Sequence, residues 1–408
     1  MNRSAQATLG SVASGTPSLS RVASTIFIVV CLLPWTSFGT NNLDSQPWPL
    51  LFGMLLIAAF SGKLASTRNL KLAIFAVILG LYIASINSSS SGFIIIRAFY
   101  NYISFFIVLL VFLTILDHFK PPIRTIRFIN YVWIVAALIQ IIQPSLIAAI
   151  GKARTTAERG LTSLSPEPTF FAIYLIFSSL LLFQLRGFDH RKDLSLHVIN
   201  LLAVALLARS SMGLLMVVVC FCTYVIYLMT KIKLKKQIMV GLGITAGLGI
   251  VVVFVFKTYL TESRVASLVD ALTEQGILGI IQYDASMNVR IEHVVFSIHG
   301  AVRNYLLPGG FDSFSENRSA IVDSYGGYFW YGVGSDKIMS WSGDWLYSLG
   351  IFGLLSLAFI ATSAYDRTRE SFFFLGLVFV LLLSAIPVAF PLVPMLFATM
   401  IHRIRVRS

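Results

Sequence analysis

Long stretches of apolar residues, separated by short polar segments, make up most of this chain. Twelve such runs occupy residues 22–38, 48–60, 70–86, 93–116, 126–150, 168–185, 196–208, 211–230, 237–256, 344–362, 371–387 and 388–401. A helix needs about 20 apolar residues to cross a bilayer, and several runs are close to that length. The pattern predicts an all-α fold, a polytopic membrane bundle of about twelve transmembrane helices.

Composition supports a membrane protein and excludes an ordinary soluble domain. Hydrophobic residues make up 57% of the 408 positions and charged residues only 12%, with a mean hydropathy of +0.82. A soluble protein has about a quarter of its residues charged. The cysteines Cys31, Cys220 and Cys222 all lie in apolar runs, which argues against a disulfide framework or a cysteine metal site.

The net charge of +13 has an uneven distribution along the chain. With the N-terminus inside, the inner connections of a twelve-span protein hold 20 of the 31 basic residues and five of the 18 acidic ones. This is the positive-inside pattern, and it places both termini in the cytoplasm. The excess is then explained by topology and contact with anionic lipids, without nucleic acid as a partner. Arg97 stands within a span, where it either snorkels or lines a cavity.

The expected organisation has five parts. They are a flexible tail (1–21), transmembrane helices 1–9 (22–256), a large periplasmic loop (257–343), transmembrane helices 10–12 (344–402) and a basic cytoplasmic tail (403–408). Loops longer than about 15 residues usually carry function or structure of their own. Apolar residues recur at helical spacing over 265–272 and 291–305, which predicts two amphipathic helices in the large loop.

The large loop also carries candidate ligand-binding side chains. Nine aromatic residues between 311 and 345 are mixed with Gly, Ser and Asp, a combination that suits a sugar chain. We take Tyr328, Trp330 and Trp341 as glycan-binding candidates, with an interfacial aromatic belt as the alternative. On the second predicted helix, Arg290 shares a face with His293, and His299 shares one with Arg303.

The outer connection 151–167 places Lys152, Arg154 and Arg159 where positive charge is normally scarce. These cations suggest an anionic ligand, and phosphate suits the guanidinium fork; lipid phosphates are the alternative partner. Glu167 precedes Pro168 at the start of a span. It either caps the helix, or acts as a general base or orients a sugar hydroxyl.

Arg209 lies at the outer junction of two spans with almost no connecting loop. An arginine pinned between short helices has limited access to bulk water, and a charge in that position is a functional candidate.

Two short motifs carry a resemblance to a known family. They are Arg-Gly-x-x-x-x-x-x-Glu-Pro, from Arg159 to Pro168, and Arg-Ser-Ser-x-Gly-Leu-Leu, from Arg209 to Leu215. With the large outer loop that follows, they resemble the Wzy-like O-antigen and exopolysaccharide polymerases of the O-antigen ligase superfamily. The resemblance implies a GT-C-like membrane glycosyltransferase that needs no metal and no cofactor. It would act on undecaprenyl-diphosphate-linked glycans at the outer face of the bacterial cytoplasmic (inner) membrane.

The resemblance also implies roles for individual residues. The family's outer arginines would map to Arg154 or Arg159, to Arg209 and to Arg290, which would bind the diphosphate, and its Glu to Glu167. To Glu167, Arg209 and Arg290 we add His299 as a catalytic candidate from the residues themselves. Ligase-type members have a His just before the return helix, where this chain has Trp341-Ser342-Gly343-Asp344. That departure favours polymerase over ligase and leaves the base open among Glu167, His293, His299 and Asp344.

The expected function is therefore polymerisation of lipid-linked repeat units by inverting glycosyl transfer. Expected partners are the lipid-linked glycan and membrane lipids, with a chain-length regulator and a flippase as candidate protein partners. The alternatives are a lipid-linked oligosaccharide flippase, an O-antigen ligase and a non-catalytic membrane receptor.

Overall fold

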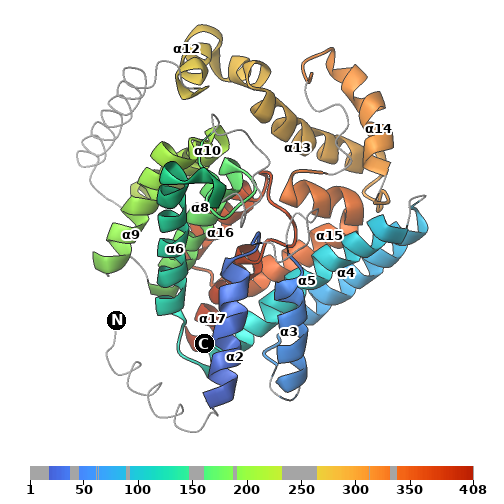
Figure 1. Cartoon of the computed structure of the whole chain (residues 1–408). Helices are drawn as coiled ribbons and strands as arrows, with labels where there is room; N and C mark the ends of the chain where they lie inside the picture. The colour runs from blue at the N-terminus through green and yellow to red at the C-terminus, as the bar shows by residue number, and fades with distance from the viewer. Residues whose placement is uncertain are drawn as a thin grey trace.

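A computed structural model describes residues 18–407 apart from 37–45, 61, 63, 89–91, 147–159, 187–190, 232–263, 312 and 331–337. Within these residues the chain is all-α, with sixteen helical segments (Figure 1). The strand-like pairing in the described part is a single bridge between Ser340 and Ala385.

Eleven of the twelve predicted apolar runs coincide with helices, and the twelfth, 237–256, lies outside the described residues. The helices are α2 (Ser18–Leu32), α3 (Trp48–Ala59), α4 (Arg68–Ile86), α5 (Gly92–His118), α6 (Ile123–Ile142), α8 (Pro168–Arg186), α9 (Arg191–Leu202), η2 (Ala203–Ala208), α10 (Ser211–Lys231), α15 (Trp341–Ala364), α16 (Arg369–Leu381) and α17 (Leu392–Arg407). The large loop contributes α12 (Arg264–Tyr283), α13 (Ala285–Arg303), α14 (Ser313–Val322) and η3 (Asp323–Tyr325).

Five of the described helices, α4, α5, α6, α8 and α15, are long and apolar enough to cross a membrane. This makes the chain a multi-pass helical membrane protein by length and composition. Others are apolar but shorter: α3 has 12 residues, which at 1.5 Å per residue spans about 18 Å of a core about 30 Å thick. The described part of the chain therefore contains five helices of full spanning length, fewer than the twelve spans predicted.

The centre of the bundle is formed by α5, α8 and α17. Residues 392–401 of α17 are all buried, and the helix packs against both α5 and α8. Its basic end makes ion pairs, from Arg405 to Asp117 at 2.5 Å and from Arg407 to Asp366 at 2.7 Å. The burial of α17 explains why so short an apolar run is helical, because its partners cover every side.

Helix α15 is broken at Gly350, where φ is 56° and ψ is −134°. The carbonyl oxygen of Leu306 enters the break and accepts a 2.7 Å hydrogen bond from the Ile351 amide. A Cβ on Gly350 would lie 2.3 Å from that oxygen, so only glycine fits there. The segment after α13 is therefore tied into the span that follows the large loop.

The large loop forms a helical layer at one end of the bundle, where α12, α13 and α14 lie above α10 and α15 in Figure 1. Both predicted amphipathic helices are present, and α14 is an additional one. Asp284 caps α13 by accepting a 2.8 Å hydrogen bond from the Met287 amide. A second apolar core of Phe296, Phe314, Ile321, Phe329 and Tyr347 joins α13 and α14 to α15. This core positions α13 over the ends of the spans.

Candidate functional site

Arg209 lies at the link between two apolar helices. The π-helix η2 ends at Ala208, Arg209 follows with a left-handed backbone (φ 48°, ψ 33°), and α10 begins at Ser211. The Arg209 Nε donates a 3.2 Å hydrogen bond to the Leu206 carbonyl, and the residue is exposed. Left-handed backbone at a non-glycine residue is uncommon and costs about 1–3 kcal/mol, and π-helical turns are frequent at functional sites. The strained link fixes where the guanidinium leaves the bundle.

Gly160 packs directly against this link. Its φ is 114°, and a Cβ there would lie 2.1 Å from the Ala208 carbonyl oxygen and 3.3 Å from the Arg209 Cβ. The next residue, Leu161, donates a 2.9 Å backbone hydrogen bond to the Leu207 carbonyl. The glycine of the Arg-Gly motif is therefore required by close approach of two backbones. Arg159 and Arg154 lie outside the described residues.

The segment from Gly160 to α8 is held by buried hydrogen bonds. Gln140 Oε1 accepts from the amides of Thr162 at 3.0 Å and Ser163 at 2.8 Å. The Ser163 hydroxyl donates to the Trp133 carbonyl at 2.6 Å, and residues 162–166 are all buried. A loop with its polar groups satisfied inside the bundle is rigid, so it holds the residues that follow it in place.

Glu167 is the last residue before α8. Its carbonyl accepts hydrogen bonds from the amides of Phe170 and Phe171, at 3.1 and 3.2 Å, and from the Ser165 hydroxyl at 2.7 Å. The residue is half-buried, and its carboxylate has no ion-pair partner within the described part of the chain. A carboxylate here is stabilised by the positive end of the helix. The backbone bonds thus fix Glu167 at the edge of the site.

Arg290, on α13, is the third component. Its Nη2 donates a 3.0 Å hydrogen bond to the Thr169 hydroxyl, and Thr169 in turn lies 3.1 Å from the Ser210 hydroxyl. Thr169 follows Glu167 and Pro168, and Ser210 follows Arg209. This chain of polar contacts brings together three segments that are far apart in the sequence: the start of α8, the link before α10 and the first turns of α13.

The chemistry of this junction suits an anion. The Arg290 guanidinium and the N-terminal ends of α8 and α10 meet there, with Arg209 next to Ser210 in the chain, and helix N-termini carry partial positive charge. Arginine offers several N–H donors to a phosphate. Glu167, two residues before Thr169, adds a carboxylate able to accept a proton. We call Gly160, Glu167, Thr169, Arg209, Ser210 and Arg290 the arginine site.

His299 does not lie in the arginine site. It is nine residues after Arg290 on α13, about 13 Å along the helix and half a turn around it. Its Nδ1 lies 3.2 Å from the hydroxyl of Tyr325, which packs against the second core. The geometry therefore does not support His299 as a catalytic partner of Arg290.

The three predicted glycan-binding aromatics have different environments. Trp330 is half exposed, and its indole N–H donates to the Gln282 carbonyl at 2.7 Å. Tyr328 is half-buried against Phe329. Trp341 is fully buried beside Phe105 and Trp345. Trp341 is therefore a core side chain in this structure, without the exposed ring face that the prediction expected.

A buried ion pair between Glu292, two residues after Arg290 on α13, and Arg318 was not predicted from the sequence. Arg318 on α14 donates from Nε to Glu292 Oε1 at 2.7 Å, and both side chains are almost fully buried. Burial raises the pKa of Glu292, opposed by Arg318. His293 accepts from the Met339 amide at 3.2 Å and stacks on Phe314. Burial, with a contribution from Arg318, lowers the His293 pKa to about 4, so this imidazole is neutral at pH 7 and a weak base.

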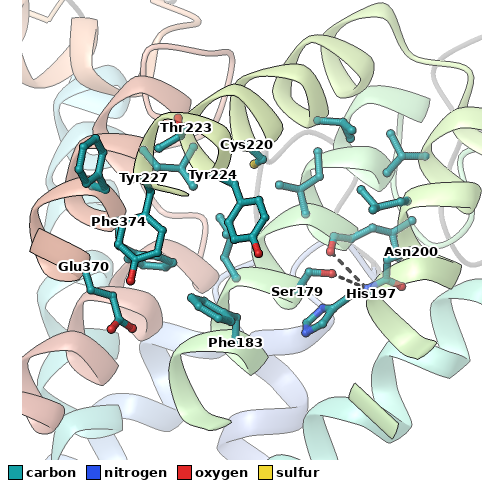
Figure 2. A pocket seen from close by; sticks show the side chains of 18 residues that line it. Ser179, Phe183, His197, Asn200, Cys220, Thr223, Tyr224, Tyr227, Glu370 and Phe374 are labelled. Carbon is teal, nitrogen blue, oxygen red and sulfur yellow. Dashed lines mark hydrogen bonds between the residues drawn. The ribbon is translucent and has the colours of Figure 1, made fainter. Parts of the chain in front are cut away.

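A larger, mainly apolar cavity of about 700 Å³ opens between α8, α9, α10 and α16 (Figure 2). In the predicted topology it lies in the inner half of the bundle. Figure 2 shows Ser179, His197 and Asn200 gathered on one wall, where the Asn200 amide donates to the Ser179 hydroxyl at 2.8 Å. Tyr224 and Tyr227 of α10 line it opposite Phe183. A cavity of this size and polarity can hold a lipid chain.

Among the described residues, no cluster of three or more His, Cys, Asp or Glu side chains is placed to hold a metal ion. The chain matches no protein-family model and no curated protein sequence.

Proposed function

We propose that the chain is a membrane glycosyltransferase that polymerises undecaprenyl-diphosphate-linked oligosaccharide repeat units at the outer face of the bacterial cytoplasmic membrane. The product would be O-antigen or exopolysaccharide. The observation that carries the proposal is the polar chain from Arg290 through Thr169 to Ser210. It gathers at one point the two motifs by which the sequence resembles the Wzy-like polymerases, together with a loop arginine.

The proposed topology has twelve spans with both termini in the cytoplasm. It is supported by the asymmetric charge of the connections and by the coincidence of eleven apolar runs with helices. In this orientation the starts of α8 and α10 face outward, and α12–α14 form a layer on the outer side.

The proposed reaction is a direct displacement. A hydroxyl of the acceptor sugar attacks the anomeric carbon of the donor glycan, the bond from that carbon to the diphosphate oxygen breaks, and undecaprenyl diphosphate leaves with the electron pair. The anomeric centre is inverted, and the hydroxyl proton passes to a protein base.

Arg209 and Arg290 would stabilise the charge that develops on the leaving diphosphate, with Arg154 and Arg159 assisting. A fixed donor of this kind is worth about 10²–10³ in rate. Glu167 is the candidate base, because its backbone is fixed two residues before Thr169. His299 is not supported by its position, and the lowered pKa of His293 makes it a poor acceptor at neutral pH.

The apolar cavity would hold the lipid tail of a substrate. Helix α8 runs from Thr169, at the arginine site, to Phe183, in the cavity wall. These residues are about 21 Å apart along the helix, so one helix connects the proposed diphosphate site with the proposed tail site.

Reconstitution tests this function directly. The purified full chain is placed in lipid nanodiscs with lipid-linked repeat units extracted from a strain that lacks this gene. A ladder of longer lipid-linked glycans is the expected product. Absence of any ladder, with units still consumed onto a lipid A acceptor, would instead identify a ligase.

A flippase is distinguished in the deletion strain. Loss of a polymerase leaves single repeat units on the outer face, whereas loss of a flippase leaves them on the inner face. Repeat units confined to the inner face would contradict the proposal.

A further inference from the structure

A small polar pocket lies at the first turns of α5 and α15, bordered by the segment after α13 and the connection between α16 and α17. We call it the outer pocket, after its side in the proposed topology. Its polar lining includes Arg97, Asn101, Tyr102, Asp344 and Ser348. It leaves about 90 Å³ for the centres of water molecules, which is room for several waters.

The polar groups of the outer pocket are held in fixed positions. The Ser348 hydroxyl donates a 2.7 Å hydrogen bond to Asp344 Oδ1, and the Tyr102 hydroxyl donates a 3.3 Å bond to the Asp344 carbonyl. The Ser340 hydroxyl caps α15 by accepting from the Gly343 amide at 3.1 Å. Asp344 is thus held by Ser348 and Tyr102 in the capped first turn of α15.

Arg97 shares this pocket with Asp344, yet the two form no ion pair in the described part of the chain. If charge compensation were their whole purpose, direct contact would be the stable arrangement in a half-buried setting. The open space around them instead leaves donors and acceptors for a molecule that enters. Hydroxyl groups, which donate and accept at once, match such a mixed lining.

Aromatic rings supply the apolar wall. Phe311 is fixed by its amide, which donates to the Ser88 hydroxyl at 2.9 Å, and by ring contact with Phe99. Behind Phe311, the buried Phe314 packs edge-on against Tyr347, with ring centroids 5.4 Å apart, and supports the wall from the second core. A sugar ring presents C–H faces to aromatic surfaces and hydroxyls to charged and amide groups. The outer pocket offers both kinds of surface.

The outer pocket borders the arginine site through two side chains. Phe314 lines the pocket and stacks on His293, with ring centroids 5.3 Å apart. His293 lies three residues after Arg290 on α13. The pocket is therefore connected, through Phe314 and His293, to the part of α13 that also carries Arg290.

We infer that the outer pocket binds a sugar residue of the acceptor repeat unit, with Arg97, Asn101 and Asp344 as its hydrogen-bonding partners. This inference rests on the proposed function, because it assigns a place to the second substrate of that reaction. The chemistry recognised is a neutral or acidic pyranose with adjacent hydroxyls, not the diphosphate.

The test uses the full chain in nanodiscs and a water-soluble acceptor, the repeat-unit oligosaccharide released from extracted lipid-linked units by mild acid. Its concentration is varied at fixed lipid-linked donor, and then the donor is varied. Asp344→Asn and Asn101→Ala are each expected to raise the acceptor KM at least tenfold and to change the donor KM less than twofold. Arg303→Ala, which removes an exposed outer cation away from the pocket, is the control and leaves both constants unchanged.

An unchanged acceptor KM in both pocket variants, with normal turnover by the wild type, overturns the sugar site and leaves the polymerase standing. If the wild type makes no polymer, the polymerase proposal fails, and binding decides the pocket separately. Saturation-transfer NMR of the same oligosaccharide then gives signals with the wild type that fall at least tenfold in Asn101→Ala. Equal signals with the wild type and Asn101→Ala, or no signal with the wild type, overturn the assignment of the outer pocket as a sugar site.

Discussion

Gly160 and Ala208 approach so closely that a Cβ on the glycine would lie 2.1 Å from the alanine carbonyl oxygen. This contact joins the segment before α8 to the end of the π-helix and brings it beside Arg209.

Gly160→Ala is expected to damage both stability and activity. The left-handed φ of 114° costs an alanine about 1–3 kcal/mol, and the clash moves one backbone away from the other. Thermal unfolding of the detergent-purified protein should start at a lower temperature, and polymer synthesis should fall. Gly376→Ala, where a Cβ has no neighbour within 4 Å, is the matched control. An equal effect in both variants would show that the Gly160 contact is unimportant.

Loss of either described arginine should abolish long polymer while the protein remains folded. Arg209→Ala and Arg290→Ala each remove a fixed cation from the leaving group, and turnover should fall roughly a hundredfold or more. Arg290→Lys keeps the charge but loses the fork, so it should recover part of the rate at best. Polymer ladders and thermal unfolding are measured together, with Arg303→Ala as control. Normal ladders in both alanine variants would remove these residues from the mechanism.

His293 should make stability depend on pH. Its folded pKa of about 4 lies below the ordinary 6.5, so the unfolded chain binds the proton first. The stabilisation is complete above pH 6.5 and is lost as the pH falls through about 4. At 1.36 kcal/mol per pKa unit, the whole effect is about 3 kcal/mol.

The His293 prediction is checked by thermal unfolding of wild type and His293→Asn from pH 7.5 to 4.5. Asparagine keeps an acceptor for the Met339 amide but does not titrate. The difference in unfolding temperature between the two proteins at pH 7.5 measures the effect of the substitution on packing alone. On acidification, the variant should lose less stability than the wild type. Parallel curves for the two proteins would contradict the assignment.

The buried pair of Glu292 and Arg318 should be strongly destabilised when only one partner is removed. Arg318→Leu leaves a buried carboxylate without its cation, a change that costs about 3–5 kcal/mol in comparable sites. Glu292→Leu combined with Arg318→Leu should recover most of that loss. Unfolding of both variants in detergent decides this. If the double variant is less stable than Arg318→Leu alone, the ion pair itself stabilises the layer formed by α12–α14.

Filling the cavity of Figure 2 should weaken the use of substrates with long lipid tails and spare those with short tails. Thr223→Trp fills part of the space between α8 and α10, so the KM for undecaprenyl-linked units should rise about tenfold. A short-chain, two-isoprene analogue should be unaffected, because it does not reach the inner half. Tyr82→Trp, on the exposed surface of α4, is the control. Equal increases for both substrates would argue against the tail site.

Much of the fold could be predicted because helix positions follow from apolar run lengths. Helix α4, for example, spans Arg68–Ile86 where the sequence indicated 70–86. The break in α15 at Gly350 was not predictable, because glycine is common inside apolar helices and the entering carbonyl comes from Leu306, far back in the chain.

The arginine site was predictable only in part. Arg209 and Arg290 stood out as outer cations, but the hydroxyls that join them, Thr169 and Ser210, are ordinary residues in sequence. The sequence indicates the outer pocket more weakly. Arg97 and Asp344 are far apart in the chain, and each is also typical of a side chain at the membrane–water boundary. Long-range packing, invisible in a single sequence, decides both.

The two-residue link that carries Arg209 has a mechanical consequence. Because η2 and α10 meet without a flexible loop, the Arg209 backbone cannot move independently of the tilt of these helices. The tilt of a membrane helix adjusts to bilayer thickness. Turnover should therefore vary with the acyl-chain length of the surrounding lipid, so that the membrane itself helps to set the geometry of the charged group.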